Sequence, residues 1–172
     1  MQKQVEYTEA IKRKYPEQIV IAIAKDGDGR ANPVTVGWTM IASGNPPMMA
    51  ISLAAGHYTV EAIDHSKCFT IAFPSAEMSD MALFFGSRSG RDTEKFADSD
   101  CRTLPATQID SLLLADAVAN FECVAHSQMR AGDHIIYVGA VVASHVNTES
   151  KRRLYTVAPG HTLGTVCTAS RE

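Results

Sequence analysis

The sequence lacks a strong charge excess, a long apolar run and a leader-like start. Its 16 Lys and Arg residues against 19 Asp and Glu residues leave a formal net charge of −3. A small negative charge with scattered basic residues does not suit a nucleic-acid surface. No apolar run approaches the roughly 18 residues that cross a bilayer, and the first residues form no apolar core of a signal peptide. We therefore expect a cytoplasmic protein with no nucleic-acid and no membrane partner.

The sequence also lacks the cysteine and histidine spacings of a local metal site. Its cysteines lie far apart, with no C-x-x-C pair, at Cys68, Cys101, Cys123 and Cys167. This spacing excludes a local zinc knuckle and a thioredoxin-type motif. Cys68 and Cys123 lie in apolar runs, where a thiol packs as a small hydrophobe. None of the six histidines is paired at ligand spacing. We expect reduced thiols and no metal site.

The common nucleotide-binding and hydrolase motifs are missing as well. Residues 26–29 (Asp-Gly-Asp-Gly) start like a calcium loop, but Arg30 and Ala31 follow and no glutamate stands at the twelfth position. The same glycines lack the third glycine and the following helix of a dinucleotide fingerprint. No G-x-S-x-G elbow and no phosphate loop ending in Gly-Lys-Ser/Thr occurs. Residues 26–29 are therefore predicted to form a turn.

The length and composition indicate one globular domain. With 172 residues and 45% apolar residues, the chain can bury a sizeable core. No linker or repeat divides it, so we predict a single domain over residues 1–172 with a helical extension at residues 1–15. A short helix is expected over Thr8–Lys14, because the residue before Pro16 is disfavoured in a helix.

Short apolar or alternating segments indicate strands. We expect strands at residues 19–25, 31–41, 48–53, 68–73, 117–129 and 134–143, and a last short strand closed by Val166. Two helices interrupt them. One is capped by Thr59 and runs to about His65, and the other is capped by Ser75 and ends near Phe85 with Gly86 as a left-handed stop. Many strands and no regular β-α-β alternation favour a mainly β, antiparallel barrel.

Three segments carry hydroxyls and cations suited to binding an anion. Residues 38–43 (WTMIAS) end a predicted strand, residues 57–59 (HYT) precede a predicted helix, and residues 87–91 (SRSGR) lead to Lys95. Free backbone N–H groups and the helix dipole make a helix start a ready phosphate site. Each segment alone also fits a cap, a turn or a solvated loop.

Taken in order, these segments resemble the flavin reductase-like family, which includes the flavoredoxins and the reductase components of two-component monooxygenases. The resemblance spans about residues 15–145. It rests on residues 32–39 (NPVTVGWT), Ser43, Pro46-Pro47, Tyr58-Thr59, Ile63, Phe69, Ser87-x-Ser89-Gly90-x-Asp92, Lys95-Phe96 and Gly132-Asp133-His134. It implies a split β-barrel of Greek-key type with a few short helices, and a homodimer with flavin mononucleotide (FMN) at or near the subunit interface.

The resemblance also implies which residues bind FMN. Thr39, Met40 and Ser43 are expected at the ring and ribityl chain, together with Ser52. Residues His57, Tyr58 and Thr59 are expected to take the phosphate, and Ser87, Arg88, Ser89 and Lys95 to close over it. Relatives often carry arginine at the position of His57, and histidine is only partly charged near neutral pH. The missing charge is then supplied by Arg88, Arg91 or Lys95.

His134, which opens a strand after a turn, is the candidate catalytic residue. It either faces the flavin or a docked nicotinamide, or is a turn histidine bonded to Asp133. The resemblance implies an NAD(P)H-dependent flavin or iron(III) reductase, with NADH or NADPH as a transient electron donor. The alternatives are an FMN-bearing electron carrier that serves a redox-protein partner without turnover of its own, and a pyridoxamine-phosphate-oxidase-like barrel.

Overall fold

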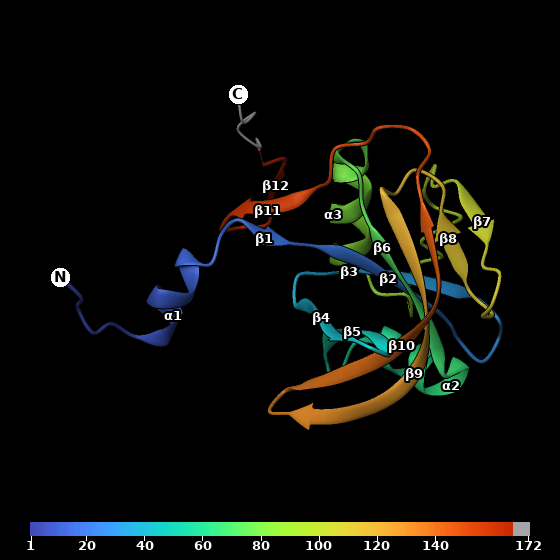
Figure 1. Ribbon diagram of the computed structural model, residues 1–172, viewed down its shortest axis with the longest axis horizontal. Helices are drawn as coiled ribbons and strands as arrows, with labels where there is room; N and C mark the ends of the chain where they lie inside the picture. Colours follow the sequence, from blue (N-terminus) through green and yellow to red (C-terminus); the bar gives the residue numbers. More distant parts are fainter. Residues whose placement is uncertain (167–172) are drawn as a thin grey trace.

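The computed structural model describes residues 1–166 and is built around one curled antiparallel sheet (Figure 1). The sheet has seven strands in the spatial order β3-β2-β6-β9-β10-β5-β4. The strands are β2 (Val20–Lys25), β3 (Ala31–Val36), β4 (Thr39–Gly44), β5 (Pro47–Ala54), β6 (Cys68–Phe73), β9 (Ala119–Ala131) and β10 (His134–Val146). The prediction of a mainly β barrel with few short helices is confirmed.

The barrel is split between β3 and β4. These strands follow each other in sequence but lie at opposite edges of the sheet, so the prediction of one strand over residues 31–41 was wrong. The chain leaves β3 at Gly37 and enters β4 after Trp38. Gly37 passes close to β1 (Glu17–Gln18), and a Cβ added to Gly37 would lie 3.2 Å from the Glu17 carboxylate. The alternation of residue types continues through Gly37 and Trp38, so it predicts one strand. Alternation alone does not show where a sheet bends.

The long hairpin of β9 and β10 joins the two halves of the barrel. The first part of β9 pairs with β6, and the first part of β10 pairs with β5. Register shifts after Val138 and Val141 bend the hairpin, as bulges do. Gly139 lies at one of them, and an added Cβ would lie 2.7 Å from the buried Phe69 ring. The close approach of strand and ring therefore requires glycine.

Two apolar cores lie on the two faces of β2. Inside the barrel, Val20 and Ala22 pack with residues such as Ile51, Phe69 and Tyr137. On the outer face, Ile21 and Ile23 pack against helix α3 (Ser79–Ser87) and its preceding 3-10 turn η2 (Ala76–Met78) through Met78, Ala82 and Phe85. Burial on both faces explains why β2 reads as a continuous apolar run.

The helices differ from the sequence prediction at their ends. Helix α2 (Tyr58–Ser66) begins before Thr59, which is buried and accepts a hydrogen bond from Asn32 Nδ2 at 2.8 Å. Thr59 is therefore not a cap. Gly86 lies inside α3 rather than at a left-handed stop, and an added Cβ would lie 3.3 Å from Thr35. Glycine lets α3 approach β3 closely here.

A second, three-stranded sheet joins the two ends of the chain. It contains β1 (Glu17–Gln18), β11 (Tyr155–Ala158) and β12 (Thr162–Gly164), so the last strand closes before Val166 and not at it. The predicted helix over Thr8–Lys14 is present as α1 (Tyr7–Ala10) and the 3-10 turn η1 (Ile11–Arg13), which extend away from the barrel (Figure 1). Within residues 1–166, no helix has the length and apolar character to span a membrane. Cys68, Cys101 and Cys123 are free thiols, and Cys167 lies outside the described residues.

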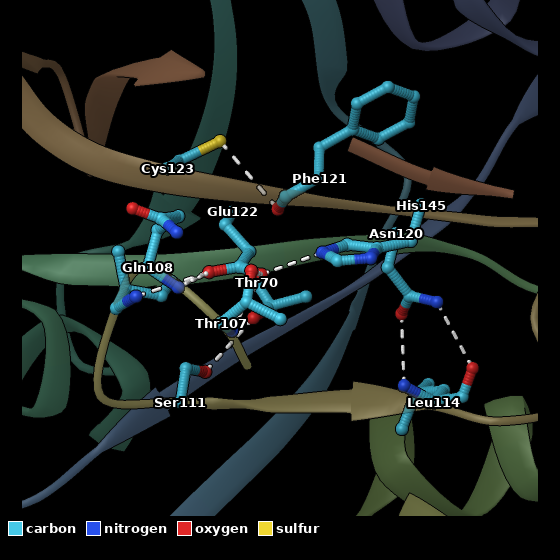
Figure 2. A network of polar contacts seen from close by, with 11 residues as sticks. Thr70, Thr107, Gln108, Ser111, Leu114, Asn120, Phe121, Glu122, Cys123 and His145 are labelled. Atoms are coloured by element: carbon cyan, nitrogen blue, oxygen red, sulfur yellow. Dashed lines mark hydrogen bonds and ion pairs between the residues drawn. The ribbon is translucent and has the colours of Figure 1, made fainter. Parts of the chain in front are cut away.

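A buried carboxylate holds a loop against the barrel (Figure 2). The short strands β7 (Thr103–Pro105) and β8 (Leu112–Leu114) flank this loop. The Glu122 side chain on β9 accepts hydrogen bonds from the backbone N–H groups of Thr107, Gln108 and Ile109 at 2.9, 2.6 and 3.1 Å. It also contacts the Thr107 hydroxyl at 2.8 Å and His145 Nε2 at 2.7 Å. Every donor of the loop that faces Glu122 is therefore paired with a fully buried charge.

Because of these hydrogen bonds to Glu122, the stability of the fold depends on pH. Burial raises the pKa of Glu122, but the N–H groups of Thr107 and Gln108 and the His145 ring outweigh it and lower the pKa to about 2. Because the folded pKa lies below the unfolded value near 4.5, Glu122 stabilises the fold fully above about pH 5. This contribution is lost as the pH falls towards 2. We expect Glu122→Gln to cost roughly 2–4 kcal/mol at pH 7 and to flatten the acid dependence.

Urea unfolding at pH 7 and pH 4 measures both effects. The exposed Glu149→Gln variant is the control, because among residues 1–166 the Glu149 carboxylate pairs only with Lys151 on the surface. Equal pH dependence in wild type and Glu122→Gln would contradict the role assigned to Glu122.

Candidate functional site

A cavity of about 540 Å³ lies where the chain crosses between β3 and β4. The crossing residues Val36, Gly37 and Trp38 form one wall. The other walls come from the end of β5 (Ser52, Leu53, Ala54), the start of α2 (His57), α3 (Ala82, Leu83, Gly86, Ser87), β10 (His134) and the segments around the small sheet (Lys14, Tyr15, Glu17, Thr156, His161, Leu163). The cavity therefore lies at the split of the barrel, and its lining is mostly apolar with a few polar groups.

Trp38 and His134, which both line this cavity, pack against each other. Their ring centroids lie 4.5 Å apart with planes tilted by 34°. The Trp38 carbonyl accepts a hydrogen bond from Ser52 N at 2.8 Å, which fixes the crossing to β5. His134 Nδ1 lies 2.7 Å from the Asp133 carboxylate. His134 is therefore bonded to Asp133, as one of the two expectations for it stated, and it also lines the cavity.

The start of α2 offers backbone donors beside the cavity. His57 N donates to Ala54 O, and the first intrahelical bond runs from Val60 N to His57 O. The N–H groups of Tyr58 and Thr59 are thus left without intrahelical partners, as at every helix start. Burial, His134 and Lys95 lower the pKa of His57 below its usual value, so its ring is neutral at pH 7. His57 can hydrogen-bond an anion but adds no full positive charge.

The loop of residues 88–95 lies beside this helix start. Arg91 donates to Gly56 O at 3.1 Å and pairs with Glu61 on α2, and its guanidinium lies 5.3 Å from the centre of the Tyr58 ring. Gly90 is buried, and an added Cβ would lie 2.8 Å from the Tyr58 ring. The second and third polar segments of the sequence therefore come together.

Lys95 anchors this loop to the barrel and to α3. Its side chain is buried, and its Nζ donates to Pro33 O at 2.8 Å and to Phe85 O at 2.9 Å. Burial lowers the pKa of Lys95 to about 8. In this arrangement Lys95 joins the loop to β3 and to the end of α3, whereas the sequence predicted that it closes over a phosphate.

The first polar segment contributes less than expected. Thr39 Oγ1 donates to Ala50 O at 3.0 Å, Met40 is 56% exposed, and Ser43 lies opposite Met48 near the far end of β4. None of the three lines the cavity. Trp38, from the same segment, does. Of the predicted site residues, the cavity brings together Ser52, His57, Ser87 and His134.

The remaining predicted residues are not among those that line the cavity. Tyr58 OH donates to Asp26 at 2.7 Å and accepts from Arg30 at 2.9 Å, and Thr59 is bonded to Asn32. Arg88 and Ser89 are exposed on the loop, where Ser89 Oγ accepts from Arg91 N at 3.2 Å.

Sequence reasoning missed the wall formed by the ends of the chain. Lys14, Tyr15, Thr156, His161 and Leu163 all line the cavity. The Pro159-Gly160 pair between two short segments of β-forming residues is a hairpin signal that could have revealed part of this wall.

Comparisons with known proteins agree with this architecture. A family model described as "Flavin reductase like domain" matches residues 12–162. The chain is 30% identical over 129 residues to the NADH-dependent FMN reductase AsuE2 of Streptomyces nodosus subsp. asukaensis, a match that covers 73% of this chain and 67% of that protein. The fold is similar to that of flavoredoxin from Methanosarcina acetivorans, with a TM-score of 0.86 at 19% identity over 100% of this chain and 95% of that one. An FMN-binding protein from Thermus thermophilus gives a TM-score of 0.82 at 20% identity, over 96% and 94% of the two chains.

The buried Lys95 predicts a measurable change in the loop. Lys95→Met leaves the carbonyls of Pro33 and Phe85 without their donor, so we expect a loss of roughly 1–3 kcal/mol in the free energy of unfolding. We also expect trypsin to cleave faster after Arg88 and Arg91 under native conditions. Mass spectrometry of the digest measures this rate. Lys12→Met, on the exposed η1 turn, is the control. Cleavage of the loop at the wild-type rate would show that Lys95 does not hold it.

Proposed function

The chain belongs to the flavin reductase-like family, and on this basis we propose that it binds FMN in the cavity at the β3–β4 crossing and accepts electrons there from NADH or NADPH. The acceptor of these electrons is a free flavin or iron(III). Membership of this family favours this function over that of a pyridoxamine-phosphate-oxidase-like barrel.

The residues of the cavity fit a flavin nucleotide. Ligand sites of this kind are largely apolar with a few convergent polar groups, and this cavity combines apolar residues such as Trp38 and Leu53 with polar groups such as Ser52. Trp38, Ser52 and His134 would hold the ring system. The N–H groups of Tyr58 and Thr59, with His57 and Ser87, would bind the phosphate. Bound FMN would supply the hydride and electron chemistry.

The charge for the phosphate is assigned to Arg88. Lys95 is committed to two carbonyls, Arg91 to Gly56 and Glu61, and His57 is neutral at pH 7. Arg88 follows Ser87 at the cavity rim, is exposed, and has no hydrogen-bond or ion-pair partner among residues 1–166. It is therefore the cation of this loop that remains available to an incoming anion.

The other polar residues orient the reactants. The Asp133 carboxylate holds the His134 ring by its Nδ1 atom, which leaves Nε2 for a ligand. Trp38 packs on the same ring and limits its rotation. His134 would thereby position either the flavin or the nicotinamide, in the role that the sequence suggested for it.

FMN titration tests the phosphate assignment. We expect Arg88→Gln to raise the dissociation constant of FMN about 10- to 100-fold, because one charge-assisted hydrogen bond is worth roughly 1.5–3 kcal/mol. Quenching of FMN fluorescence measures this constant. Arg13→Gln, on the exposed N-terminal turn, is the matched control. If Arg88→Gln binds FMN as wild type does, the phosphate is held elsewhere.

Oxidation of NADH by the wild-type protein with FMN distinguishes the enzyme from an electron carrier. A rate well above that of free flavin is expected. A protein that binds FMN tightly but shows no rate above this background would be a carrier or binding protein.

A homodimer is the assembly that the surface supports. Side chains alternate between the two faces of a strand, so Ser52 and His134, which line the cavity, share the outer face of the sheet with Met40, Val138 and Met129. Met40 and Met129 are 56% and 61% exposed. A second copy that packs on this apolar face would also cover the cavity.

Sedimentation tests this assembly. We expect Met40→Asp and Met129→Asp to shift a dimer towards monomer and to weaken FMN binding several-fold, because an unpaired charge in a buried contact is costly. Leu104→Asp, equally apolar and 53% exposed on β7, should leave the dimer intact. A wild-type protein that sediments as a monomer and still binds FMN would contradict the proposal.

A further inference from the structure

His161 lies at the tip of the β11–β12 hairpin in a backbone conformation that non-glycine residues rarely adopt. Its φ is 58°, directly after Gly160 at 78°. Such conformations are disfavoured for side chains with a Cβ and recur at ligand-binding positions. His161 also lines the cavity, although its hairpin is no part of the barrel. The turn therefore adds an imidazole to a cavity whose other polar side chains come largely from the barrel and its helices.

A series of contacts across the cavity shows that the wall formed by the small sheet lies opposite the start of α2. Lys14 Nζ lies 5.9 Å from the centre of the Trp38 ring, and Trp38 stacks on His134 at 4.5 Å. His134 and His57, at the start of α2, both line the cavity. These residues thus form a row that runs from Lys14, beside the small sheet, to His57 at the start of α2. The phosphate proposed for FMN occupies the α2 end, and the small-sheet end is left for a second molecule.

The groups at the small-sheet end have a definite chemistry. Trp38, Tyr15 and Leu163 supply flat and apolar surface. Lys14 lies 2.7 Å from Glu17, so its charge is largely balanced. The His161 ring has no hydrogen-bond or ion-pair partner within the described part of the chain. A ring nitrogen without a partner beside an aromatic surface suits a planar ring that carries a phosphate.

We propose that His161 is a binding residue for the nicotinamide dinucleotide donor and contacts its phosphates from the β11–β12 hairpin. This inference rests on the proposed function, because it requires that a flavin occupy the α2 end. It assigns the C-terminal hairpin to donor binding and His161 to donor affinity. FMN affinity depends on other residues, and His161 makes no contribution to it.

Binding of NAD⁺, which cannot deliver a hydride, tests His161. In His161→Asn the imidazole is lost, while asparagine tolerates the left-handed conformation. We expect the dissociation constant of NAD⁺ for the FMN-loaded protein, measured by calorimetry, to rise about tenfold, as for the loss of one hydrogen bond to a charged group. The KM for NADH should rise by a similar factor with little change in kcat, and the FMN dissociation constant should stay within about twofold.

Two further variants separate binding from folding. His126→Asn, on the exposed part of β9 and outside the cavity, should bind NAD⁺ as wild type does. His161→Gly suits the left-handed backbone better than histidine, so its melting temperature should not fall, yet its NAD⁺ affinity should drop as in His161→Asn. Unchanged NAD⁺ affinity in both His161 variants, or an equal loss of FMN affinity, would overturn the inference.

The sequence itself provides a second readout. Trp38 is its only tryptophan and lines the cavity, so its fluorescence reports NAD⁺ binding to the flavin-free protein. A wild-type protein that fails to bind FMN defeats the proposed function and the premise of this inference, whereas weaker NAD⁺ binding by His161→Asn than by the wild type, at unchanged FMN affinity, concerns His161 alone. Absence of any Trp38 response to NAD⁺ in a protein that binds FMN would overturn the inference and leave the proposed function standing.

Discussion

The split between β3 and β4 is the constraint on which the site depends. Two strands that follow each other in sequence lie at opposite edges of one sheet, so the two residues between them must bridge the opening. Gly37 permits the close passage beside Glu17, and Trp38 fills the opening with a flat side chain. The end of β5, the start of β10 and helix α3 all meet there. If β3 and β4 were joined by hydrogen bonds and closed the barrel, this opening and the cavity at it would not exist.

Two buried charges hold the loops that surround this barrel. Glu122 binds the backbone of the 107–109 loop, and Lys95 binds the carbonyls of Pro33 and Phe85. Each charge is costly to bury and is matched by partners of fixed geometry. Lys95 bears directly on the site, because it keeps the 88–95 loop beside the start of α2. A lysine that looks available in the sequence thus anchors a loop in the structure, and Arg88 of the same loop is exposed.

The sequence predicted the architecture well, and four of the predicted site residues line the cavity. The apolar run of β2, the alternation of β9 and the turn at Gly132-Asp133 are local signals that tertiary packing preserves. The break at Gly37-Trp38 could not be predicted, because it is set by the curvature of the whole sheet. For the same reason the sequence did not reveal that Thr39, Met40 and Ser43 lie outside the cavity lining. The small sheet was missed since its strands have two to four residues, too few to show a period. The burial of Lys95 likewise arises from contacts with residues far away in sequence.

The pairing of Glu17 with Thr156 has a consequence for how the protein is made. During synthesis the strands β2 to β10 emerge before β11 and β12 and can pair among themselves, but the wall formed by β1, β11 and β12 needs residues 155–164. The cavity is therefore completed only after every strand of the barrel has been translated. A chain terminated before Tyr155 would form much of the barrel and still present an open cavity.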